Sequence, residues 1–305
     1  MDKEAIDAVC ACYLHAPHEL TIVIEPQSAH RLNLCRAWNI QPGQRILDIG
    51  CGQGDATVAL AYLVGPTGHV TGIDPAPPGY GAPQTLGQAW AYTLGSALGE
   101  RISFRQAEAP AFLATEEGRE EFDVATLSHS LWYFQSREKV EELFVALAAS
   151  RVKQVCIAEF TGQARTDAQV PHRLAVLVQR RIHRLSKPHQ NAVDALNMRE
   201  ALDPAELLDI AARAGWRVRD RGVVEAAPGL LDGHWEVQAV TGPRFANRVR
   251  EAELSPEDEG QLLGAVAEIG EFVERLEVPG ELRERGAKVI AMDVTWAVLE
   301  RQHHT

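Results

Sequence analysis

The sequence has few cysteines and no long apolar run. Its cysteines are odd in number and lack the paired spacing of zinc ligands; they are Cys10, Cys12, Cys35, Cys51 and Cys156. We therefore expect reduced thiols and no metal site. No apolar run approaches the roughly 20 residues that a membrane-spanning helix needs. The amino terminus has two acids beside a lysine, unlike a signal or transit peptide. These absences predict a cytoplasmic protein with no membrane partner.

An excess of positive charge is also missing. Thirty Lys and Arg residues face 42 Asp and Glu residues, which gives a net charge of −12. Nucleic acids and anionic membranes repel an acidic surface, so we expect a small-molecule substrate and no nucleic-acid partner. One dense basic run, residues 180–184, can meet an anionic substrate or pair with nearby acids.

Strand and helix patterns alternate from the Pro42-Gly43 turn onward. We expect short buried strands at residues 45–49, 69–73, 102–104, 122–127 and 152–157, with helical segments between them. Buried strands that alternate with helices imply right-handed crossovers and a parallel sheet covered on both faces. The pattern predicts a doubly wound, mostly parallel α/β fold.

The alternation is interrupted after the fifth strand. Residues 161–202 predict a helical insertion with helices near 170–186 and 191–201, longer than a plain connection requires. Its position suggests a lid over a substrate pocket. Two strand-like runs, 216–226 and 234–240, then predict an antiparallel hairpin that completes a sheet of seven strands.

These patterns divide the chain into three parts. Residues 1–41 are an N-terminal helical segment, 42–240 the α/β domain, and 241–305 a helical C-terminal extension. In the extension, Ser255 begins a helix whose apolar stripe either packs on its own domain or forms the seam of a homodimer. Residues 287–299 fit a helix or a strand.

The loop after the first strand carries the chemical signal. Asp48 lies near the strand end, and Gly50, Gly52 and Gly54 follow before a helix begins. Glycines let the backbone turn sharply and let a ligand approach closely, and a helix N-terminus attracts an anionic group. A triphosphate-binding loop needs a lysine after the glycines, and the dinucleotide fingerprint needs a wider glycine spacing. A ligand with an ammonium and a carboxylate but no phosphate fits better, because Asp48 would repel pyrophosphate.

Two further strand ends support this interpretation. Asp74 ends the second strand, where a carboxylate can accept both ribose hydroxyls of an adenosine group. Ala107 and Glu108 follow the third strand, where a side chain or a backbone N–H can meet the adenine edge.

Residues 46–54 resemble the first motif of class I S-adenosylmethionine (SAM)-dependent methyltransferases, and residues 72–74 resemble their second. Residues 122–131 are similar to their fourth strand and the loop after it. The nearest likeness is to small-molecule methyltransferases of the ubiquinone-biosynthesis type. The resemblance implies a Rossmann-like methyltransferase fold and SAM as the cofactor.

The resemblance also implies roles for individual residues. Positions expected to contact or order the cofactor are Asp48, Gly50, Cys51, Gly52, Gly54, Asp74, Pro75 and Ser128. The family often has an Asp-Ala pair where this chain has Ala107-Glu108. Either Glu108 replaces that acid from a shifted position or the backbone alone holds the adenine.

Methyl transfer requires mainly alignment, which can supply about 7–11 kcal/mol. His129 is the candidate general base, or else it hydrogen-bonds at the strand end. Trp132 and Tyr133 form an aromatic wall for the acceptor or pack in the core. His30 and Arg31 can reach the carboxylate of SAM, although Arg31 also fits a solvated helix face.

The sequence thus predicts methyl transfer from SAM to a small molecule by direct SN2 attack, with oxygen favoured over nitrogen or carbon. An alternative is a methyltransferase fold that holds SAM for non-methyl chemistry such as cyclisation or rearrangement. A methylase of protein or RNA is disfavoured by the acidic charge and by the lack of an Asn-Pro-Pro-Tyr tetrapeptide after strand four. A NAD-dependent reductase is the remaining alternative.

Overall fold

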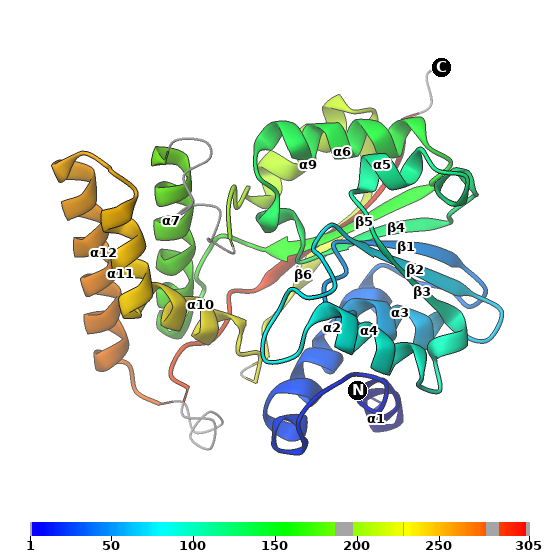
Figure 1. Ribbon diagram of the computed structural model, residues 1–305, viewed down its shortest axis with the longest axis horizontal. Helices are drawn as coiled ribbons and strands as arrows, with labels where there is room; N and C mark the ends of the chain where they lie inside the picture. The colour runs from blue at the N-terminus through cyan, green and yellow to red at the C-terminus, as the bar shows by residue number, and fades with distance from the viewer. Residues whose placement is uncertain (1, 187–197, 228, 279–286, 303–305) are drawn as a thin grey trace.

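A computed structural model describes residues 2–186, 198–227, 229–278 and 287–302 (Figure 1). Its centre is a seven-stranded sheet in the order β3-β2-β1-β4-β5-β7-β6. The strands are β1 (Arg45–Ile49), β2 (His69–Asp74), β3 (Ile102–Gln106), β4 (Val124–Ser128), β5 (Gln154–Phe160), β6 (Trp216–Val224) and β7 (Val294–Arg301). The first five are parallel, and β7 is antiparallel to both of its neighbours. The predicted doubly wound, mostly parallel sheet is confirmed.

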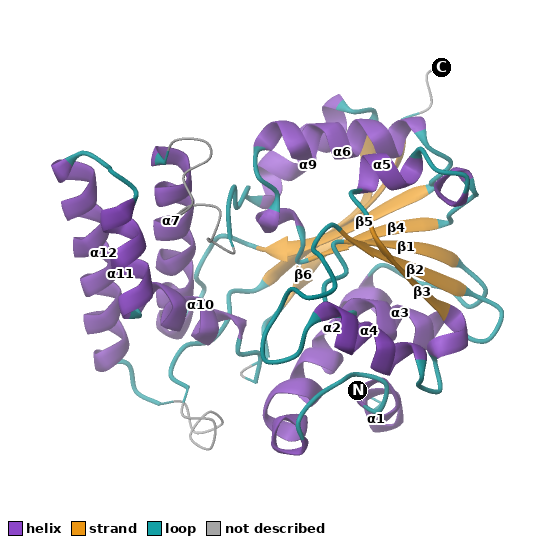
Figure 2. Cartoon of the chain, viewed as in Figure 1, coloured by secondary structure: helices purple, strands orange, loops and turns teal. Residues whose placement is uncertain are grey.

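Helices cover both faces of the sheet, as Figure 2 shows by colour. One face carries α1 (Lys3–Cys10), α2 (Glu25–Ala37), α3 (Asp55–Val64) and α4 (Leu86–Leu94). The other carries α5 (Ala109–Leu113), α6 (Arg137–Ala149) and α9 (Pro204–Arg213). Strands β1, β2, β4 and β5 between them are buried on both sides, which explains their continuous apolar runs. Two hydrophobic cores therefore hold the sheet, one on each face.

The predicted hairpin is wrong in its second strand. Residues 234–240 lie in a helix, α10 (Asp232–Thr241), and the strand that pairs with β6 is β7. Val237 and Val240 are buried and lie three positions apart, while Gln238 between them is exposed. That spacing places both valines on one face of a helix. A short run with β-branched residues does not show in the sequence whether it forms a helix or a strand.

Strand β7 lies between β5 and β6, so the segment after residue 240 completes the sheet. The predicted boundary at 240 therefore does not separate the sheet from a helical extension. Of the two possibilities for residues 287–299, strand is correct from Val294 onward.

A group of helices lies beyond the carboxyl end of β5 (Figure 1). It consists of α7 (Val170–Leu185), α10, α11 (Pro243–Glu251) and α12 (Pro256–Arg275). Helix α7 is the first predicted helix of the insertion; most of the second, near 191–201, lies outside the described residues. The apolar stripe of α12 includes Leu262 and Ile269, and both are buried within this group. The stripe therefore packs on its own chain.

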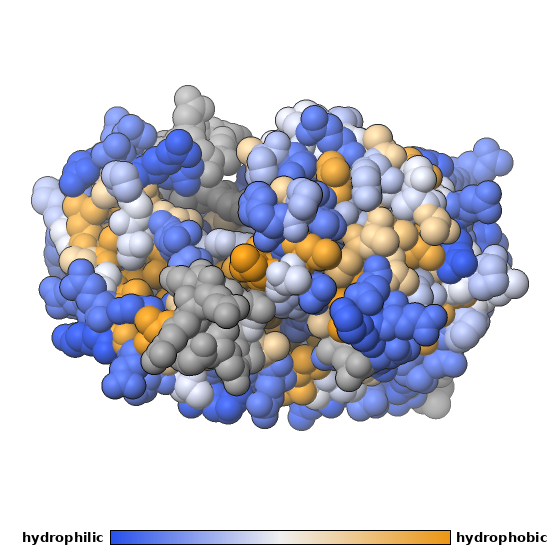
Figure 3. Space-filling view, turned by 90° about the horizontal axis from the view of Figure 1, so that it is seen from below, coloured by the Kyte–Doolittle hydropathy of each residue, from blue (hydrophilic) through white to orange (hydrophobic). Residues whose placement is uncertain are grey.

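The face in Figure 3 is mostly hydrophilic, with hydrophobic residues in separate groups. Among the described helices, none is both long and apolar enough to cross a membrane.

Candidate active site

A cavity of about 710 Å³ opens at the carboxyl ends of the parallel strands. Its walls come from the loops after β1 to β5, from α2 and from α10. Of the residues predicted for the site, those that line it are Gly50, Cys51, Gly52, Asp74, Pro75, Ala107, Glu108, Ser128, His129 and Tyr133. His30, Asp48 and Gly54 lie behind this wall. The structure thus brings most of the predicted residues to one cavity.

The glycine loop after β1 is held in a left-handed conformation. Gly50, Gly52 and Gly54 have φ angles of +70°, +53° and +96°, a region that favours glycine. A Cβ on Gly50 would lie 2.6 Å from the Cβ of Ser130. The Gly52 N–H donates to Asp74 Oδ2 at 3.0 Å, and Trp90 Nε1 donates to the Gly52 carbonyl at 2.8 Å. The loop is therefore fixed from two sides.

Asp48 does not reach the cavity. It is 1% exposed and accepts hydrogen bonds from the hydroxyls of Thr57 at 2.6 Å and Thr126 at 2.8 Å. Burial raises the pKa of Asp48 to about 6, and the two hydroxyls oppose that rise. The carboxyl connects β1, β4 and α3, so it orders the loop from behind.

The strand ends of β2 and β3 meet beside this loop. Asp74 Oδ1 accepts from the Ala76 N–H at 2.9 Å, and the Ala107 N–H donates to the Asp74 carbonyl at 3.0 Å. Glu108 precedes α5 at its N-cap position and lines the cavity from there. Pro75 lies between these groups in the wall. The acid near the end of β3 is therefore Glu108, one position after the place where the family often has an aspartate.

Arg31 is buried, which corrects the solvated alternative. It is 6% exposed, its Nε donates to Asp55 Oδ2 at 2.7 Å, and it lines the cavity. Its Nη1 is buried without a hydrogen-bond partner. Because a buried guanidinium has five donors to satisfy, this side chain can still bind an anion within the cavity.

His129 and His30 form a buried pair. Their Nε2 atoms are 3.0 Å apart, so one ring donates to the other. Burial, together with the charge of Arg31, lowers the pKa of His129 well below its usual value, and burial lowers that of His30 to about 3. Both imidazoles are therefore neutral near pH 7. His129 has a φ of +54° and an Nδ1 without a hydrogen-bond partner, 3.6 Å from Glu159 Oε1.

The aromatic residues predicted beside the acceptor have different surroundings. Trp132 is 3% exposed, and its Nε1 donates to the Leu202 carbonyl at 2.8 Å. Tyr133 keeps 41% of its surface accessible and also lines the cavity. Phe160 packs against His129, with ring centroids 4.6 Å apart. Trp132, Tyr133 and Phe160 all line the cavity and give this part of it an aromatic surface.

Five acids that line the cavity were not predicted as site residues: Asp55, Glu142, Glu159, Asp232 and Glu236. Glu159 lies near the end of β5, so the strand-end rule that selected Asp48 and Asp74 would also have selected it. Asp232 and Glu236 are four positions apart on α10 and share one helical face. That relation is invisible when the segment is interpreted as a strand.

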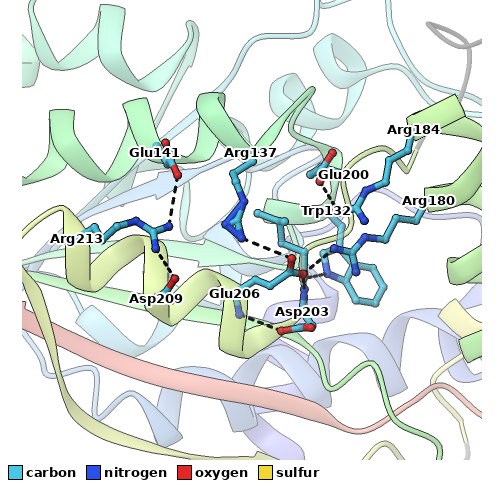
Figure 4. Close-up of polar contacts among 11 residues, drawn as sticks. Trp132, Arg137, Glu141, Arg180, Arg184, Glu200, Asp203, Glu206, Asp209 and Arg213 are labelled. Carbon is cyan, nitrogen blue, oxygen red and sulfur yellow. Dashed lines mark hydrogen bonds and ion pairs between the residues drawn. The ribbon is translucent and has the colours of Figure 1, made fainter. Parts of the chain in front are cut away.

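The basic run 180–184 pairs with acids (Figure 4). Arg180 donates to Glu206 at 2.6 Å, Arg181 pairs with Asp258 at 3.1 Å, and Arg184 pairs with Glu200 at 2.7 Å. Glu206 also meets Arg137 of α6 at 3.5 Å and caps α9 through the Asp203 N–H. These pairs attach α7 to its neighbours. They therefore favour the prediction that the basic run pairs with nearby acids over the prediction that it meets an anionic substrate.

The fold and the cavity together define a class of protein. A Rossmann-like sheet with a glycine loop and strand-end acids around one cleft is the arrangement of the SAM-dependent methyltransferases. The family model described as "Methyltransferase domain" matches residues 40–79. The methyltransferase phomM of Diaporthe leptostromiformis is 35% identical over 355 aligned positions, covering 98% of this chain and 90% of that protein. The chain therefore belongs to the class I SAM-dependent methyltransferase family, and the resemblance seen in the sequence is confirmed.

Two further similarities agree with this assignment. A cyclopropane-fatty-acyl-phospholipid synthase-like protein from Lactobacillus casei has a structure with a TM-score of 0.79 and 29% identity, over 98% of this chain and all of that one. A demethylmenaquinone methyltransferase of Halalkalibacterium halodurans is 43% identical over 53 residues, which is 17% of this chain and 22% of that protein.

Proposed function

We propose that this enzyme transfers the methyl group of SAM to a heteroatom of a small molecule by direct SN2 displacement. The cofactor would occupy the half of the cavity above β1, β2 and β3, called the donor half. The acceptor would occupy the half above β4 and β5, bounded by α10 and called the acceptor half. The observation that carries this proposal is the cleft formed by the glycine loop and Asp74.

The donor half fits SAM group by group. Gly50, Cys51 and Gly52 offer a wall without large side chains, which a nucleoside thioether can approach closely. Asp74 would accept from the ribose hydroxyls. Arg31, with its unpartnered Nη1, would hold the carboxylate. SAM supplies a methyl group already activated on its sulfonium.

The acceptor half would orient the nucleophile and remove its proton. Ser128 and His129 follow β4 and border the donor half. A neutral His129 whose Nε2–H donates to His30 has a free lone pair on Nδ1, which can accept a proton there. Glu159, 3.6 Å from Nδ1, would stabilise the imidazolium that forms. The sequence favours oxygen as the nucleophile over nitrogen or carbon. The carboxyl groups of this half favour an amine instead.

Calorimetry with SAM and S-adenosylhomocysteine tests the proposal. We expect saturable binding of both by the full chain, weakened by the substitution Asp74→Ala. Asp220→Ala, on the exposed strand β6, is the matched control and should leave the affinity unchanged. An affinity for NADH in place of both compounds would contradict the proposal. Binding of SAM without methylated product from any acceptor would favour non-methyl chemistry.

A further inference from the structure

The acceptor half of the cavity has an acidic wall. Asp232 and Glu236 line it from one face of α10, and Glu159 lines it from the end of β5. Burial of the Tyr133 hydroxyl raises its pKa, and the charges of Glu236, Glu159 and Asp232 raise it further. Three carboxyls from two elements, α10 and β5, therefore lie at one part of the cavity.

Among the described residues, no Lys or Arg forms an ion pair with the three acids, although the charge of Arg31 opposes the rise that burial causes in the pKa of Glu159 and Asp232. Arg31 donates to Asp55, and Lys139 pairs with Glu142 at 2.6 Å. Arg199 also lines the cavity, but among the described residues no ion pair connects its side chain to the three acids. The wall therefore carries more acidic than basic groups.

Two of these acids have oxygens that no protein donor satisfies. Glu159 is 2% exposed, and its Oε2 has no hydrogen-bond partner; the same is true of Asp232 Oδ2. Glu236 receives one hydrogen bond, from the neutral amide of Gln179 at 2.7 Å. Buried acceptors without partners cost free energy. A ligand that donates N–H groups would recover that cost.

The aromatic side chains nearby favour a cation over a neutral donor. Trp132, Tyr133 and Phe160 border the same space, and the face of an aromatic ring attracts a positive charge. Burial raises the pKa of Glu159 to about 8, so in the empty cavity this group tends to hold a proton, and burial also raises the pKa of Asp232 and of Glu236. A bound cation would reverse that tendency.

We propose that Asp232, Glu236 and Glu159 form a subsite for a protonated amine of the methyl acceptor, so that the substrate class is amines. The inference rests on the proposed function, because it assigns the acceptor half of the same cavity. The bound ammonium would pass one proton to Nδ1 of His129, and the carboxylate of Glu159 would stabilise the imidazolium that forms. The lone pair of the amine nitrogen would then be free to attack the methyl group, and the methylated product would again be an ammonium ion.

The test compares amines and alcohols of matched shape. The full chain with SAM would be given benzylamine and benzyl alcohol, then phenethylamine and phenethyl alcohol, and the gain of one methyl group measured by mass spectrometry. We expect methylation of the amines at least tenfold faster than that of the matched alcohols. Glu236→Gln and Asp232→Asn should each reduce this preference about tenfold, since they replace a carboxylate with an amide. Glu141→Gln, on the outer side of α6 beside Arg213, is the control.

The outcomes separate this inference from the proposed function. Binding of S-adenosylhomocysteine is measured on every variant and shows whether the fold and the donor half are intact. If the wild-type chain binds it but methylates alcohols as well as amines, or methylates no amine, the amine subsite is refuted and the methyltransferase proposal stands. A preference for amines that survives both α10 substitutions also refutes the subsite. If neither SAM nor S-adenosylhomocysteine binds, the proposed function itself fails.

Discussion

The two halves of the cavity differ in how their polar groups are satisfied. In the donor half, Asp74 accepts from two backbone N–H groups, and Asp48 behind it accepts from two hydroxyls. In the acceptor half, single atoms of Ser128, His129 and Glu159 are buried without a partner. Apart from Arg31, whose Nη1 has no partner, the donor half is thus organised before any ligand arrives. The acceptor half contains more groups that a ligand would complete.

This difference has an energetic consequence. A preorganised wall loses little conformational freedom when it binds, so its affinity depends on geometry. A wall with unsatisfied carboxyls is destabilised when empty, and its ligand is selected by charge and hydrogen bonding. Substitutions should therefore act mainly on cofactor affinity in the donor half and on pH dependence and acceptor choice in the acceptor half. Four predictions test this contrast, in order of decreasing effect.

The largest effect is expected for Gly50→Ala in the donor half. The new Cβ would meet Ser130 at 2.6 Å, and the φ of +70° disfavours any side chain. We expect S-adenosylhomocysteine to bind at least ~100-fold more weakly, about 2.7 kcal/mol, with a lower melting temperature. Gly65→Ala is the control: its φ is +68°, and no atom lies within 4 Å of the new Cβ. With a ψ of −170°, Gly65 lies in a region nearly confined to glycine, so the variant should lose about 1–3 kcal/mol of stability to backbone strain and keep its affinity.

The next effect is expected for Asp74→Asn. One carboxylate oxygen becomes an amide NH₂, which cannot accept from both the loop and a ribose hydroxyl. Calorimetry should show an affinity for S-adenosylhomocysteine reduced about tenfold, or 1.4 kcal/mol. An unchanged affinity would mean that the donor half does not hold the ribose through this residue.

In the acceptor half, Glu159→Gln should change the pH dependence of stability. The pKa of Glu159 is raised by burial to about 8 in the folded protein, above its unfolded value near 4.3. The protonated form therefore stabilises the fold below the unfolded pKa, and this contribution is lost as the pH rises through 8. The variant lacks that loss, so its stability relative to the wild type should increase between pH 5 and 8. This increase in relative stability can reach at most about 1.4 kcal/mol for each pH unit.

Thermal unfolding of the ligand-free chains at several pH values measures this difference. Glu141→Gln provides the comparison, because Glu141 is exposed on α6. Parallel curves for wild type and Glu159→Gln would contradict the assignment of a buried, protonated carboxyl to the acceptor half.

The smallest effect is expected where α7 is attached outside the cavity. Glu206→Gln weakens the contacts of Arg180 and Arg137 with α9, all partly exposed, so we expect a loss of about 1 kcal/mol in stability. Turnover of the acceptor should fall more than the affinity for S-adenosylhomocysteine. Asp258→Asn, at a more exposed pair with Arg181, should change stability by less than about 0.5 kcal/mol.

The same contrast explains what the sequence could predict. The donor half is built from residues close in sequence, Asp48 to Gly54 and Asp74, and each lies at or just after the end of a strand with a clear apolar pattern. Local spacing was therefore enough to place them. The acceptor half combines β5, the turn at Tyr133 and α10, which are far apart in the chain. No local pattern connects these segments.

Two errors had specific physical causes. The run around Val237 contains β-branched residues at a length that suits a strand, and only the burial of Val237 and Val240 on one side reveals the helix. Arg31 was compatible with a solvated face because its partner, Asp55, belongs to another helix. In both cases a tertiary contact determined the outcome, and a single sequence does not contain that information.

The position of β7 between β5 and β6 affects how the protein can be synthesised. Residues 294–301 supply hydrogen bonds to both neighbours, so a nascent chain that has reached only α12 still exposes the open edges of two strands. Unpaired edges favour association with other chains. The emerging polypeptide would thus need shielding until translation passes this strand, and a premature stop before it would yield an aggregation-prone fragment although every residue of the donor half is already made.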